Sequence, residues 1–477
     1  MLRVLPDREW PLFDVAATRR IEHAATAGLA PRTLMQRAGL ATARLALAVA
    51  PHARNAWIAC GPGNNGGDGL EAALHLAAWG KRVTVTLAGS AQALPADAAA
   101  AFAACRAAGL GIATQPPAGW DLCIDALLGI GASRPLSGAV GEAARAIHAG
   151  TGPVLAVDLP SGLDADTGQG DPVHATHTLS LLTCKPGLFT GRGRDASGDC
   201  WFDDLGVQPN EPATAWLSGP PYPARRLHVS HKGTYGDVAV IGGASGMTGA
   251  AVLAASAALH AGAGRVYLCT LDDAGIALVT GLPELMVRDW KRLPLTELAV
   301  ACGCGGGDAI SLHLGEVLAK ARDLVIDADA LNAIAASQPL QAALQDRAQQ
   351  DRATVLTPHP LEAARLLGVG TAEVQHDRLH SATSLAVRFG CVVLLKGSGT
   401  VIASPGRVPV INATGNARLA TGGTGDVLAG LIAALLATGM QPFAAAQAAA
   451  YRHGQAAEAW PAGRALTAGE LARRLVP

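Results

Sequence analysis

The chain has 477 residues, of which 50% are hydrophobic and 4% aromatic, and its formal net charge is −1. This length predicts two or three domains, because a single hydrophobic core rarely serves more than about 300 residues. The near-zero charge gives no electrostatic basis for binding nucleic acid or an anionic membrane. The apolar runs are too short to span a bilayer, the first residues lack a signal-type core, and the nine cysteines lack framework spacing, so we expect a cytoplasmic protein.

The first half of the chain has the pattern of an α/β domain with a parallel sheet. Residues 8–50 have helical periodicity, interrupted at 28–31, and a glycine-rich turn at 61–69 separates a strand from a helix that runs through Trp79. Strand, glycine turn, helix and strand form a βαβ unit, in which ligands bind at the carboxyl ends of the strands. The predicted strands are 56–60, 83–87, 122–125, 154–158 and 178–183.

A second α/β domain is predicted after a proline-rich linker. Residues 207–226 contain five prolines and little periodicity, which is typical of a linker. We therefore expect domains at 1–215 and 225–477. A helix is predicted at 249–263, and the predicted strands are 236–242, 265–270, 298–301, 324–327, 354–357 and 391–396.

The glycine turn of the first domain satisfies a dinucleotide-binding pattern, with Gly61, Gly63 and Gly66 in GxGxxG spacing. The acid that should end the second strand is missing, since 87–90 reads Leu-Ala-Gly-Ser, so an ordinary dinucleotide dehydrogenase is not expected. Asn64-Asn-Gly-Gly-Asp68 is more specific, because paired amides and a carboxylate in a glycine turn can orient a phosphate or bind a hard cation. A tight turn with left-handed asparagines is the alternative.

Three further features of the sequence suggest chemistry. Asp125 and Asp158 end strands, where carboxylates serve acid/base catalysis or cation binding, although helix capping is the ordinary alternative. Only six lysines occur, and Lys185, Lys232 and Lys396 fall in glycine- or proline-marked motifs, where a compact charge is expected. Cys302 and Cys304 form a lone CxC, which without a second pair does not predict a metal site.

In combination, the motifs of the first half resemble the YjeF N-terminal domain family of epimerases of hydrated NADH and NADPH. The motifs are Asn64-Asn-Gly-Gly-Asp68, Asp125-Ala-Leu-Leu-Gly-Ile-Gly131, Asp158-Leu-Pro-Ser-Gly162 and Thr183-Cys-Lys-Pro-Gly187. The resemblance implies a Rossmann-like three-layer domain in which Asp158 is the acid/base group, with Lys185 near it. It implies potassium held by Asn65, Asp125 and Ser161. It implies a dinucleotide site lined by Asn64, Asn65, Gly66, Gly67, Asp68, Gly129, Ile130, Gly131, Ala132, Ser133, Arg134 and Pro135. One departure is Gln36, where the family usually has Glu.

In the second half, the glycine-rich stretch 412–430 leads into an apolar helical pattern, with Asp426 in the first turn. Free amides at such a helix start can hold an anion. Asp426 is then either a general base beside a phosphate or an N-terminal acid that only suits the helix dipole. Lys396 could place its ammonium on a phosphate, although no P-loop occurs. His359 alone would more often be structural.

The motifs of the second half resemble the carbohydrate-kinase-like dehydratase of hydrated NAD(P)H, a family with a ribokinase-like fold. The resemblance covers about residues 228–470 and rests on His231-Lys-Gly233, Gly236–Gly243, Thr248-Gly-Ala250, Asp327-Ala-Asp-Ala-Leu331, Thr357-Pro-His-Pro360, Leu395–Thr400 and 421–430. It implies ADP as phosphoryl donor, with Mg²⁺, and Asp426 as a catalytic residue. It implies a nucleotide on Lys396, Gly397, Ser398, Gly399, Thr400 and Gly425, and hydrated cofactor near Ala250, Gly307, His359 and Asp426. Two departures are Leu361, in place of glycine, and the altered turn Gly303-Cys-Gly-Gly-Gly307.

The sequence as a whole predicts a bifunctional repair enzyme for hydrated NAD(P)H. Its first domain would interconvert the R and S epimers, and its second would dehydrate the S form at the expense of ADP. The expected partners are these hydrates, ADP and further copies of the chain. A ribokinase-type small-molecule kinase with a nucleotide-binding first domain is the alternative. A protein-interaction scaffold in the first domain is a third possibility, which the intact Asp158, Lys185 and cation ligands oppose.

Overall fold

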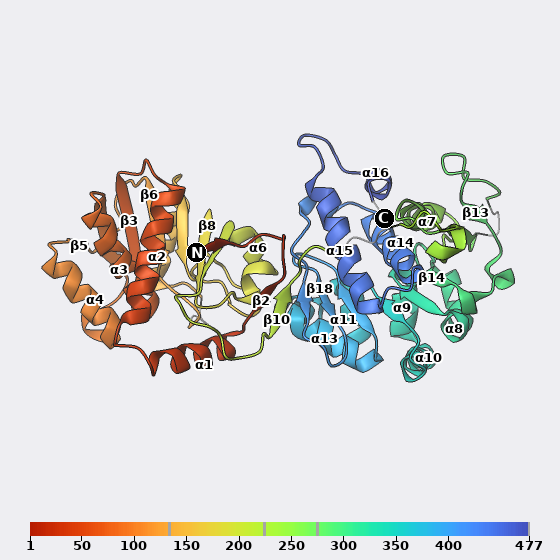
Figure 1. Ribbon diagram of the computed structural model, residues 1–477, viewed down its shortest axis with the longest axis horizontal. Coiled ribbons are helices and arrows are strands. Elements are labelled where there is room, and N and C mark those ends of the chain that lie inside the picture. The colour runs from red at the N-terminus through yellow and green to blue at the C-terminus, as the bar shows by residue number, and fades with distance from the viewer. Residues whose placement is uncertain (132–134, 223–225, 273–275, 476–477) are drawn as a thin grey trace. The chain divides into compact units, whose positions relative to one another are not determined.

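The chain divides into two compact units, shown in a computed structural model (Figure 1). The first unit consists of Met1–Leu5 and Trp10–Leu217, and the second of Pro6–Glu9 and Ser218–Pro477. Residues 6–9 thus belong with the C-terminal half of the chain, which the sequence did not indicate. The structure describes residues 1–131, 135–222, 226–272 and 276–475.

The first unit is built on a mostly parallel sheet. Its described strands are ordered β1-β9-β8-β7-β6-β3-β4-β5, and β1 at the edge pairs antiparallel while the others are parallel. The order reverses at β3, which has β4 on one side and β6 on the other. Such a switch point is where α/β sheets bind ligands. The strands are β1 Leu2–Arg3, β3 Asn55–Cys60, β4 Arg82–Leu87, β5 Ile112–Ala113, β6 Leu122–Ala126, β7 Val154–Val157, β8 His177–Leu181 and β9 Asp199–Asp203.

Helices cover both faces of this sheet, because its side chains alternate between two cores. Ile58 and Cys60 of β3 pack in the core shared with α1 to α4, whereas Trp57 and Ala59 pack in the core shared with α5. The predicted three-layer α/β fold is therefore confirmed, and Figure 1 shows α2 and α3 side by side over the sheet. The helices are α1 Val15–Thr26, α2 Thr33–Val49, α3 Asn64–Ala78, α4 Ala96–Ala107, α5 Gly138–Ala149 and α6 Gly193–Ala196.

Two short strands occur where the sequence analysis predicted a helical region and a linker. β2 (Trp10–Leu12) lies within the predicted helical region, and β10 (Ala215–Leu217) lies within the predicted linker. They pair antiparallel, and each buries its first and third residues. A three-residue alternation is too short to compete with the surrounding helical or proline-rich pattern in a sequence window.

The start of α3 also differs from the prediction. The helix begins at Asn64 rather than after the glycine stretch, and Gly63 is its N-cap. Asn64 to Asp68 therefore form the first helical turn. Gly61 is required in the turn before it, because a Cβ there would lie 1.6 Å from the Leu127 carbonyl oxygen.

The second unit contains its own sheet, whose described strands are ordered β13-β12-β11-β14-β15-β16-β17-β18-β19. The strands from β13 to β17 are parallel, while β18 and β19 pair antiparallel. The order reverses at β11, which lies between β12 and β14. The strands are β11 Asp237–Gly242, β12 Arg265–Thr270, β13 Met286–Val287, β14 Ala299–Cys302, β15 Asp323–Ile326, β16 Thr354–Leu356, β17 Val392–Leu395, β18 Val401–Ala403 and β19 Val410–Ile411.

This second sheet is also covered on both faces, which confirms the α/β class of the C-terminal half. One face forms a core with α8, α9, α10, α11 and α13. The helices α7, α14 and α15 also contact the strands, but their residues are not part of that core. The helices are α7 Thr248–His260, α8 Ser311–Lys320, α9 Ala328–Ala336, α10 Gln338–Gln349, α11 Pro360–Leu367, α12 Thr371–His376, α13 Arg378–Phe389, α14 Thr424–Ala437, α15 Pro442–Glu458 and α16 Ala468–Arg473.

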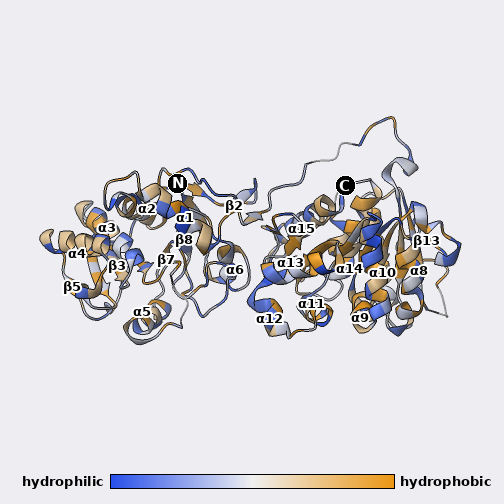
Figure 2. Cartoon of the chain, turned by 90° about the horizontal axis from the view of Figure 1, so that it is seen from below, coloured by the Kyte–Doolittle hydropathy of each residue, from blue (hydrophilic) through white to orange (hydrophobic). Residues whose placement is uncertain are grey.

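Helix α14 is buried on all sides from Val427 onward. Every residue from Val427 to Ala437 is buried, since α7, α15 and the sheet surround the helix. Figure 2 shows apolar residues concentrated there. An apolar helix of this kind belongs to a protein core. None of the helices in the described ranges combines the length and hydropathy that crossing a bilayer requires.

Candidate active sites

A cavity of about 660 Å³ opens at the switch point of the first sheet. It is bounded by α1, the first turn of α3, the loop after β6 and the end of β7. Gly63 offers no side-chain cap to α3, so the first amides of that helix remain suited to an anion. The predicted site residues that line the cavity are Asn64, Asn65, Asp68, Gly129, Ile130, Gly131, Asp158 and Lys185.

The other residues predicted for the dinucleotide are placed differently. Gly66 and Gly67 are buried in the first turn of α3, and a Cβ on Gly66 would lie 2.1 Å from the Gly61 carbonyl oxygen. Their role in the structure is close packing of the turn. Pro135 is exposed and does not line the cavity. Ala132, Ser133 and Arg134 lie outside the described residues.

Asp158 and Lys185 form a buried ion pair at the floor of this cavity. Lys185 is 1% exposed, and its Nζ donates to Asp158 Oδ1 and, at 2.7 Å, to the Leu181 carbonyl oxygen. The Leu181 amide also donates to Asp158 Oδ1, at 3.1 Å. Asp158 has a φ of 68°, and a left-handed non-glycine residue at a strand end is a form of strain found at functional sites. The predicted juxtaposition of these two side chains is therefore present.

Glu22, Asp68 and Asp97 also line this cavity, and the pKa of the first two is raised. Burial, followed by the charge of Asp158, raises the pKa of Asp68 well above its usual range. The same two causes raise the pKa of Glu22, on α1. Glu22 was not predicted from the sequence, because one acid on an amphipathic helix gives no signal of its own. The described lining thus contains three cations, Arg19, Arg32 and Lys185, and four carboxyl groups, and burial favours protonation of Glu22 and Asp68.

The predicted cation ligands lie beside the carboxyl ends of β6 and β7. Asp125 is fully buried; it accepts from Ser161 Oγ at 2.6 Å, from the Ser161 amide at 2.9 Å and from the Leu127 amide at 3.2 Å. Asn65 lies beside Gly129, where a Cβ would be 3.3 Å from its Oδ1, and its buried Nδ2 has no hydrogen-bond partner. The unpartnered Nδ2 is a donor and cannot bind a cation, but Asn65 Oδ1, the Asp125 carboxylate and Ser161 Oγ form an all-oxygen donor set that fits a hard cation.

In the second unit, charged side chains converge at the carboxyl ends of the strands. Lys396 follows β17, and its Nζ lies 2.6 Å from Asp327 Oδ1 and 4.0 Å from Glu362 Oε2. A Cβ on Gly425, at the start of α14, would lie 3.3 Å from the Lys396 ammonium. Burial opposes the charged ammonium, but the two carboxylates outweigh it and raise the pKa of Lys396.

Asp426 faces this group from the first turn of α14. Its carboxylate, that of Asp327 and the Cys304 sulfur have atoms within 4.8 Å of one another. Burial and the nearby Asp327 charge raise the pKa of Asp426 to about 6, while the Cys304 thiol and Lys396 act in the opposite direction. A carboxyl group with this pKa is suited to general-base catalysis near neutral pH.

Glu362 and His453 are additional titratable groups that sequence analysis did not assign to the site. Burial, opposed by Lys396 and supported by Asp327, raises the pKa of Glu362 to about 7. His453, on α15, is buried with its Nε2 3.0 Å from the Thr424 carbonyl oxygen, and burial lowers its pKa to about 4. His453 is therefore neutral and supports the first turn of α14. Sequence analysis did not indicate this role, because His453 reaches Thr424 only through the packing of α15 against α14.

His359 caps α11 in the structure. Its Nδ1 accepts from the amides of Leu361 and Glu362 at 3.1 and 3.3 Å, while its own amide donates to Glu362 Oε2 at 2.7 Å. This reciprocal arrangement is a capping box. The imidazole remains half exposed, so it also presents a face toward the site around Lys396.

The remaining predicted residues of the second site fall into two loops. Ala250 lies against the turn 303–307, since a Cβ on Gly305 would be 2.9 Å from its Cβ, and the Gly307 amide donates to Asp329 Oδ2 at 2.8 Å. The other loop, Lys396 to Thr400, is closed by a hydrogen bond from Thr400 Oγ1 to the Gly397 carbonyl oxygen at 3.2 Å. Gly397 and Ser398 are exposed and Gly399 is buried.

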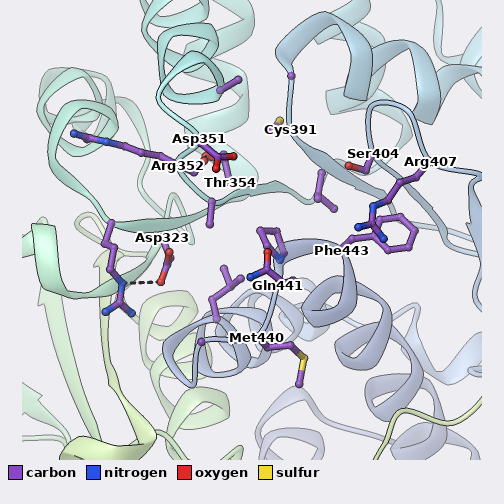
Figure 3. Close-up of a pocket in the computed structure, with 18 of the residues that line it drawn as sticks. Asp323, Asp351, Arg352, Thr354, Cys391, Ser404, Arg407, Met440, Gln441 and Phe443 are labelled. Atoms are coloured by element: carbon purple, nitrogen blue, oxygen red, sulfur yellow. Dashed lines mark hydrogen bonds and ion pairs between the residues drawn. The ribbon is translucent and has the colours of Figure 1, made fainter.

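A separate cavity of about 590 Å³ lies at the opposite edge of the second sheet (Figure 3). Asp323, Thr354 and Val392 line it and are the first residues of β15, β16 and β17. Figure 3 shows Arg407 beside Phe443, with its guanidinium carbon 5.3 Å from the ring centre. This cavity does not include Lys396 or Asp426.

Comparison with known proteins identifies both halves of the chain. The family model described as YjeF-related protein N-terminus matches residues 31–187, and that described as NAD(P)H-hydrate dehydratase matches residues 238–476. The bifunctional NAD(P)H-hydrate repair enzyme Nnr of Escherichia coli is 38% identical over 99% of this chain and 93% of its own length. The corresponding Coxiella burnetii enzyme is 36% identical over 94% of each chain.

Two further relatives each match about half of this chain. The ADP-dependent (S)-NAD(P)H-hydrate dehydratase of Neisseria meningitidis is 42% identical over 53% of this chain and 86% of its own. The crystal structure of the ADP/ATP-dependent NAD(P)H-hydrate dehydratase of Bacillus subtilis, co-crystallised with ATP and Mg²⁺, is 35% identical over 53% of this chain and 91% of its own, with a TM-score of 0.45. Because the full-length relatives cover nearly all of both halves, the chain belongs to the family of bifunctional NAD(P)H-hydrate repair enzymes.

Proposed function

We propose that this chain restores hydrated NADH and NADPH to the reduced dinucleotides in two steps. The first domain, 1–215, epimerises the R and S hydrates, and the second, 225–477, dehydrates the S hydrate at the expense of ADP. The observation that carries this proposal is the presence of two clusters of paired carboxylates and lysines, one in each unit. A buried Asp158–Lys185 pair lies in the first unit, and Asp426 faces Lys396 in the second.

In the first site, epimerisation requires the hydroxyl group to leave one face of the nicotinamide ring and a water oxygen to add to the other. Asp158 is the group that accepts and returns the proton, and Lys185 holds its carboxylate in place. The amides at the start of α3 are positioned for the pyrophosphate of the dinucleotide. Asp68 faces the same cavity, and a carboxyl group that burial favours in protonated form can donate to the departing oxygen.

A potassium ion belongs to this first site in the proposal. Asn65, Asp125 and Ser161 would hold it, and the ion would supply positive charge at the carboxyl ends of β6 and β7. The closeness of the buried Asp125 carboxylate to Ser161 Oγ, at 2.6 Å, supports this assignment, because both offer oxygen ligands. The same residues fix the loop after β6, since Ser161 Oγ also accepts from the Leu128 amide at 2.8 Å.

In the second site, ADP converts the poor leaving group of the hydrate into a good one. The substrate hydroxyl oxygen attacks the β-phosphorus of ADP, the bond to the α,β-bridging oxygen breaks, and AMP leaves while Asp426 accepts the hydroxyl proton. The phosphorylated hydrate then loses phosphate and a ring proton, which restores the reduced dinucleotide. Lys396 and the amide of Gly425 would hold the transferred phosphoryl group, which is supported by the closeness of Gly425 to the Lys396 ammonium. Mg²⁺ would bind the diphosphate.

One experiment separates this function from that of a ribokinase-type kinase. Hydrated NADH containing both epimers is supplied with ADP or ATP, and recovery of reduced-nicotinamide absorbance is followed together with nucleotide products. The proposal predicts complete recovery, with one AMP and one phosphate for each dinucleotide restored when ADP is used. A stable phosphorylated hydrate without recovery of absorbance would instead identify a kinase.

A further inference from the structure

Arg378 lies beneath the loop 396–400, on the side away from solvent. It is the first residue of α13, and its side chain is 1% exposed. A Cβ on Gly397 would come within 2.9 Å of both terminal guanidinium nitrogens, so the loop backbone rests on this side chain. Its Nη2 donates to three carbonyl oxygens at 3.2, 3.2 and 3.5 Å, those of Leu395, Lys396 and Gly399.

The positive charge of Arg378 has no anionic partner among the described residues. Its hydrogen bonds go to backbone carbonyls and to Gln375 Oε1, at 2.6 Å, and its buried Nε has no partner. Burial lowers the pKa of Arg378 to about 10, which still leaves the side chain charged near neutral pH. A buried cation without an anion is unfavourable, and an anion that binds nearby would relieve this cost.

The hydrogen bonds of Arg378 also fix the direction of the loop amides. Peptide bonds here are trans, so each amide points opposite to the carbonyl of the residue before it. The carbonyls of Lys396 and Gly399 point toward Arg378. The amides of Gly397 and Thr400 therefore point away from it, toward the face where Gly397 and Ser398 are exposed. Amides that converge in a glycine loop form an anion-binding concavity.

We propose that Arg378 is a positioning residue for the nucleotide. It orients the amides of the 396–400 loop, and it provides a buried charge that the phosphates of a bound nucleoside diphosphate neutralise. This inference rests on the proposed function only in naming ADP as the diphosphate. It assigns Arg378 a role although the side chain does not touch the ligand.

Arg347 supplies a matched control. Among the described residues of the same unit it is another fully buried arginine, at 2% exposure. Its Nη1 donates to the carbonyls of Leu318 and Ala321 at 2.7 and 2.8 Å. Burial lowers its pKa to about 10 as well. Its partners lie near the start of β15, at the sheet edge opposite the 396–400 loop. Substitutions of Arg347 should therefore lower the stability of the fold as substitutions of Arg378 do, but without altering the 396–400 loop.

The test measures ADP binding by calorimetry and the melting temperature without ADP, in full-length Arg378→Gln, Arg378→Lys, Arg347→Gln and Arg347→Lys. We expect Arg378→Gln to raise the Kd for ADP about 10- to 100-fold, as loss of charge-assisted hydrogen bonds does. The Kd of Arg378→Lys should lie between those of the parent and Arg378→Gln, because lysine keeps the charge but cannot reach all three carbonyl oxygens. The Arg347 variants should melt earlier with a Kd within about twofold of the parent. Equal Kd values for Arg378 and Arg347 variants would overturn the proposal.

Gly397→Ala keeps the test decisive if an Arg378 variant does not fold. Gly397 is exposed and has a φ of 140°, so an added Cβ strains the loop backbone and also meets the Arg378 guanidinium, while the charge is kept. We expect the Kd and the KM for ADP to rise together by about tenfold, with a smaller change in kcat; an unchanged Kd would refute the proposal. If the parent protein binds ADP but restores no hydrate, the proposed function fails while this inference stands. Epimerisation in the first site serves as an internal control.

Discussion

Asp426 combines a helix-start position with neighbours that shift its pKa in opposite directions. Burial and Asp327 raise the pKa to about 6, whereas the Cys304 thiol lowers it. The sequence left two roles open, a base or an acid that only suits the helix dipole. A dipole-stabilised carboxylate would have a lowered pKa, so the raised value favours the catalytic role.

Asp426→Asn should therefore reduce turnover of the S hydrate by about 10²- to 10⁴-fold, as loss of a general base does. The affinity for ADP should stay level or increase, because a negative charge near the phosphates is removed. The folded protein binds the Asp426 proton more tightly than the unfolded chain, so this carboxyl destabilises the fold as pH rises from about 4 to about 6. The melting temperature of the variant relative to the parent should increase over that window and remain constant above it. A folded, ADP-binding variant with near-normal turnover would remove Asp426 from the mechanism.

Cys304 provides a second prediction at this position. The kcat/KM for dehydration should fall as pH decreases through about 6, when Asp426 becomes protonated. Cys304→Ala removes the thiol that lowers this pKa, so the acid limb of the profile should move to higher pH. Cys302→Ala is the control, because Cys302 is equally buried but packs in the core on the other side of β14. If the acid limb of the kcat/KM profile lies at the same pH in both variants, Cys304 does not lower the pKa of Asp426.

Asp158→Asn keeps size and polarity but removes the proton acceptor of the first site. The R hydrate should accumulate while the S hydrate is consumed at the parental rate, because the second site is untouched. Chromatographic separation of the epimers during turnover measures both. Clearance of both epimers at the original rate would exclude Asp158 as the acid/base group.

At the scale of elements, both sites are assembled at the carboxyl ends of parallel strands; the first lies beside a reversal of strand order, and the charged groups of the second follow β15, β16 and β17. In the first unit the reversal at β3 brings the turn after β3 next to the loop after β6. In the second, the reversal at β11 brings the turn 303–307 next to the start of α7. Glycines are needed where these turns approach one another, and the polar side chains then come from the strand ends.

Asp125, at the end of β6, tests whether a strand end holds potassium. Epimerisation should depend on potassium, and Asp125→Ala should weaken both the rate and this dependence. Asp121→Ala is the control at the start of the same strand, where the Asp121 carboxylate also accepts two backbone amides, at 2.8 Å each. That variant should keep the potassium response. Full epimerase activity in sodium-only buffer would argue against the cation.

At the scale of the molecule, each unit has its own core, but the second also uses residues from the N-terminal end of the chain. Tyr451 Oη donates to the Pro6 carbonyl oxygen at 2.5 Å, and Gln447 Nε2 donates to Glu9 Oε1 at 3.0 Å. Ser218 Oγ accepts from the Ala413 amide at 2.9 Å. A separated second unit therefore should begin at Ser218 rather than at 225.

The fragment 218–477 should fold and repair only the S hydrate, with a lower melting temperature than the intact chain because it lacks residues 6–9. Full-length Tyr451→Phe removes only the hydrogen bond from Tyr451 Oη to the Pro6 carbonyl. This substitution should lower the free energy of unfolding by about 1 kcal/mol. Denaturation curves and epimer-resolved assays measure both effects. If the fragment restored the R hydrate as well, epimerisation would not be confined to the first unit.

The strand pattern and the site motifs were predictable from local sequence. Buried parallel strands appear as short apolar runs, and the residues that follow them, Asp125, Asp158 and Lys396, stand out as polar interruptions. The two α/β units and the family follow from these features. The predicted β-strands of both halves are present in the structure within one or two residues.

Tertiary structure alone decided which groups share a site and what their pKa values are. Glu22, Glu362 and His453 acquire their environments from helices that pack across the sheet edge, and no spacing along the chain encodes this. Burial of Arg378 under the 396–400 loop likewise depends on where α13 docks. The physical reason is that desolvation and charge–charge interaction depend on distance in space, whereas sequence periodicity reports only the local backbone and the face that it buries.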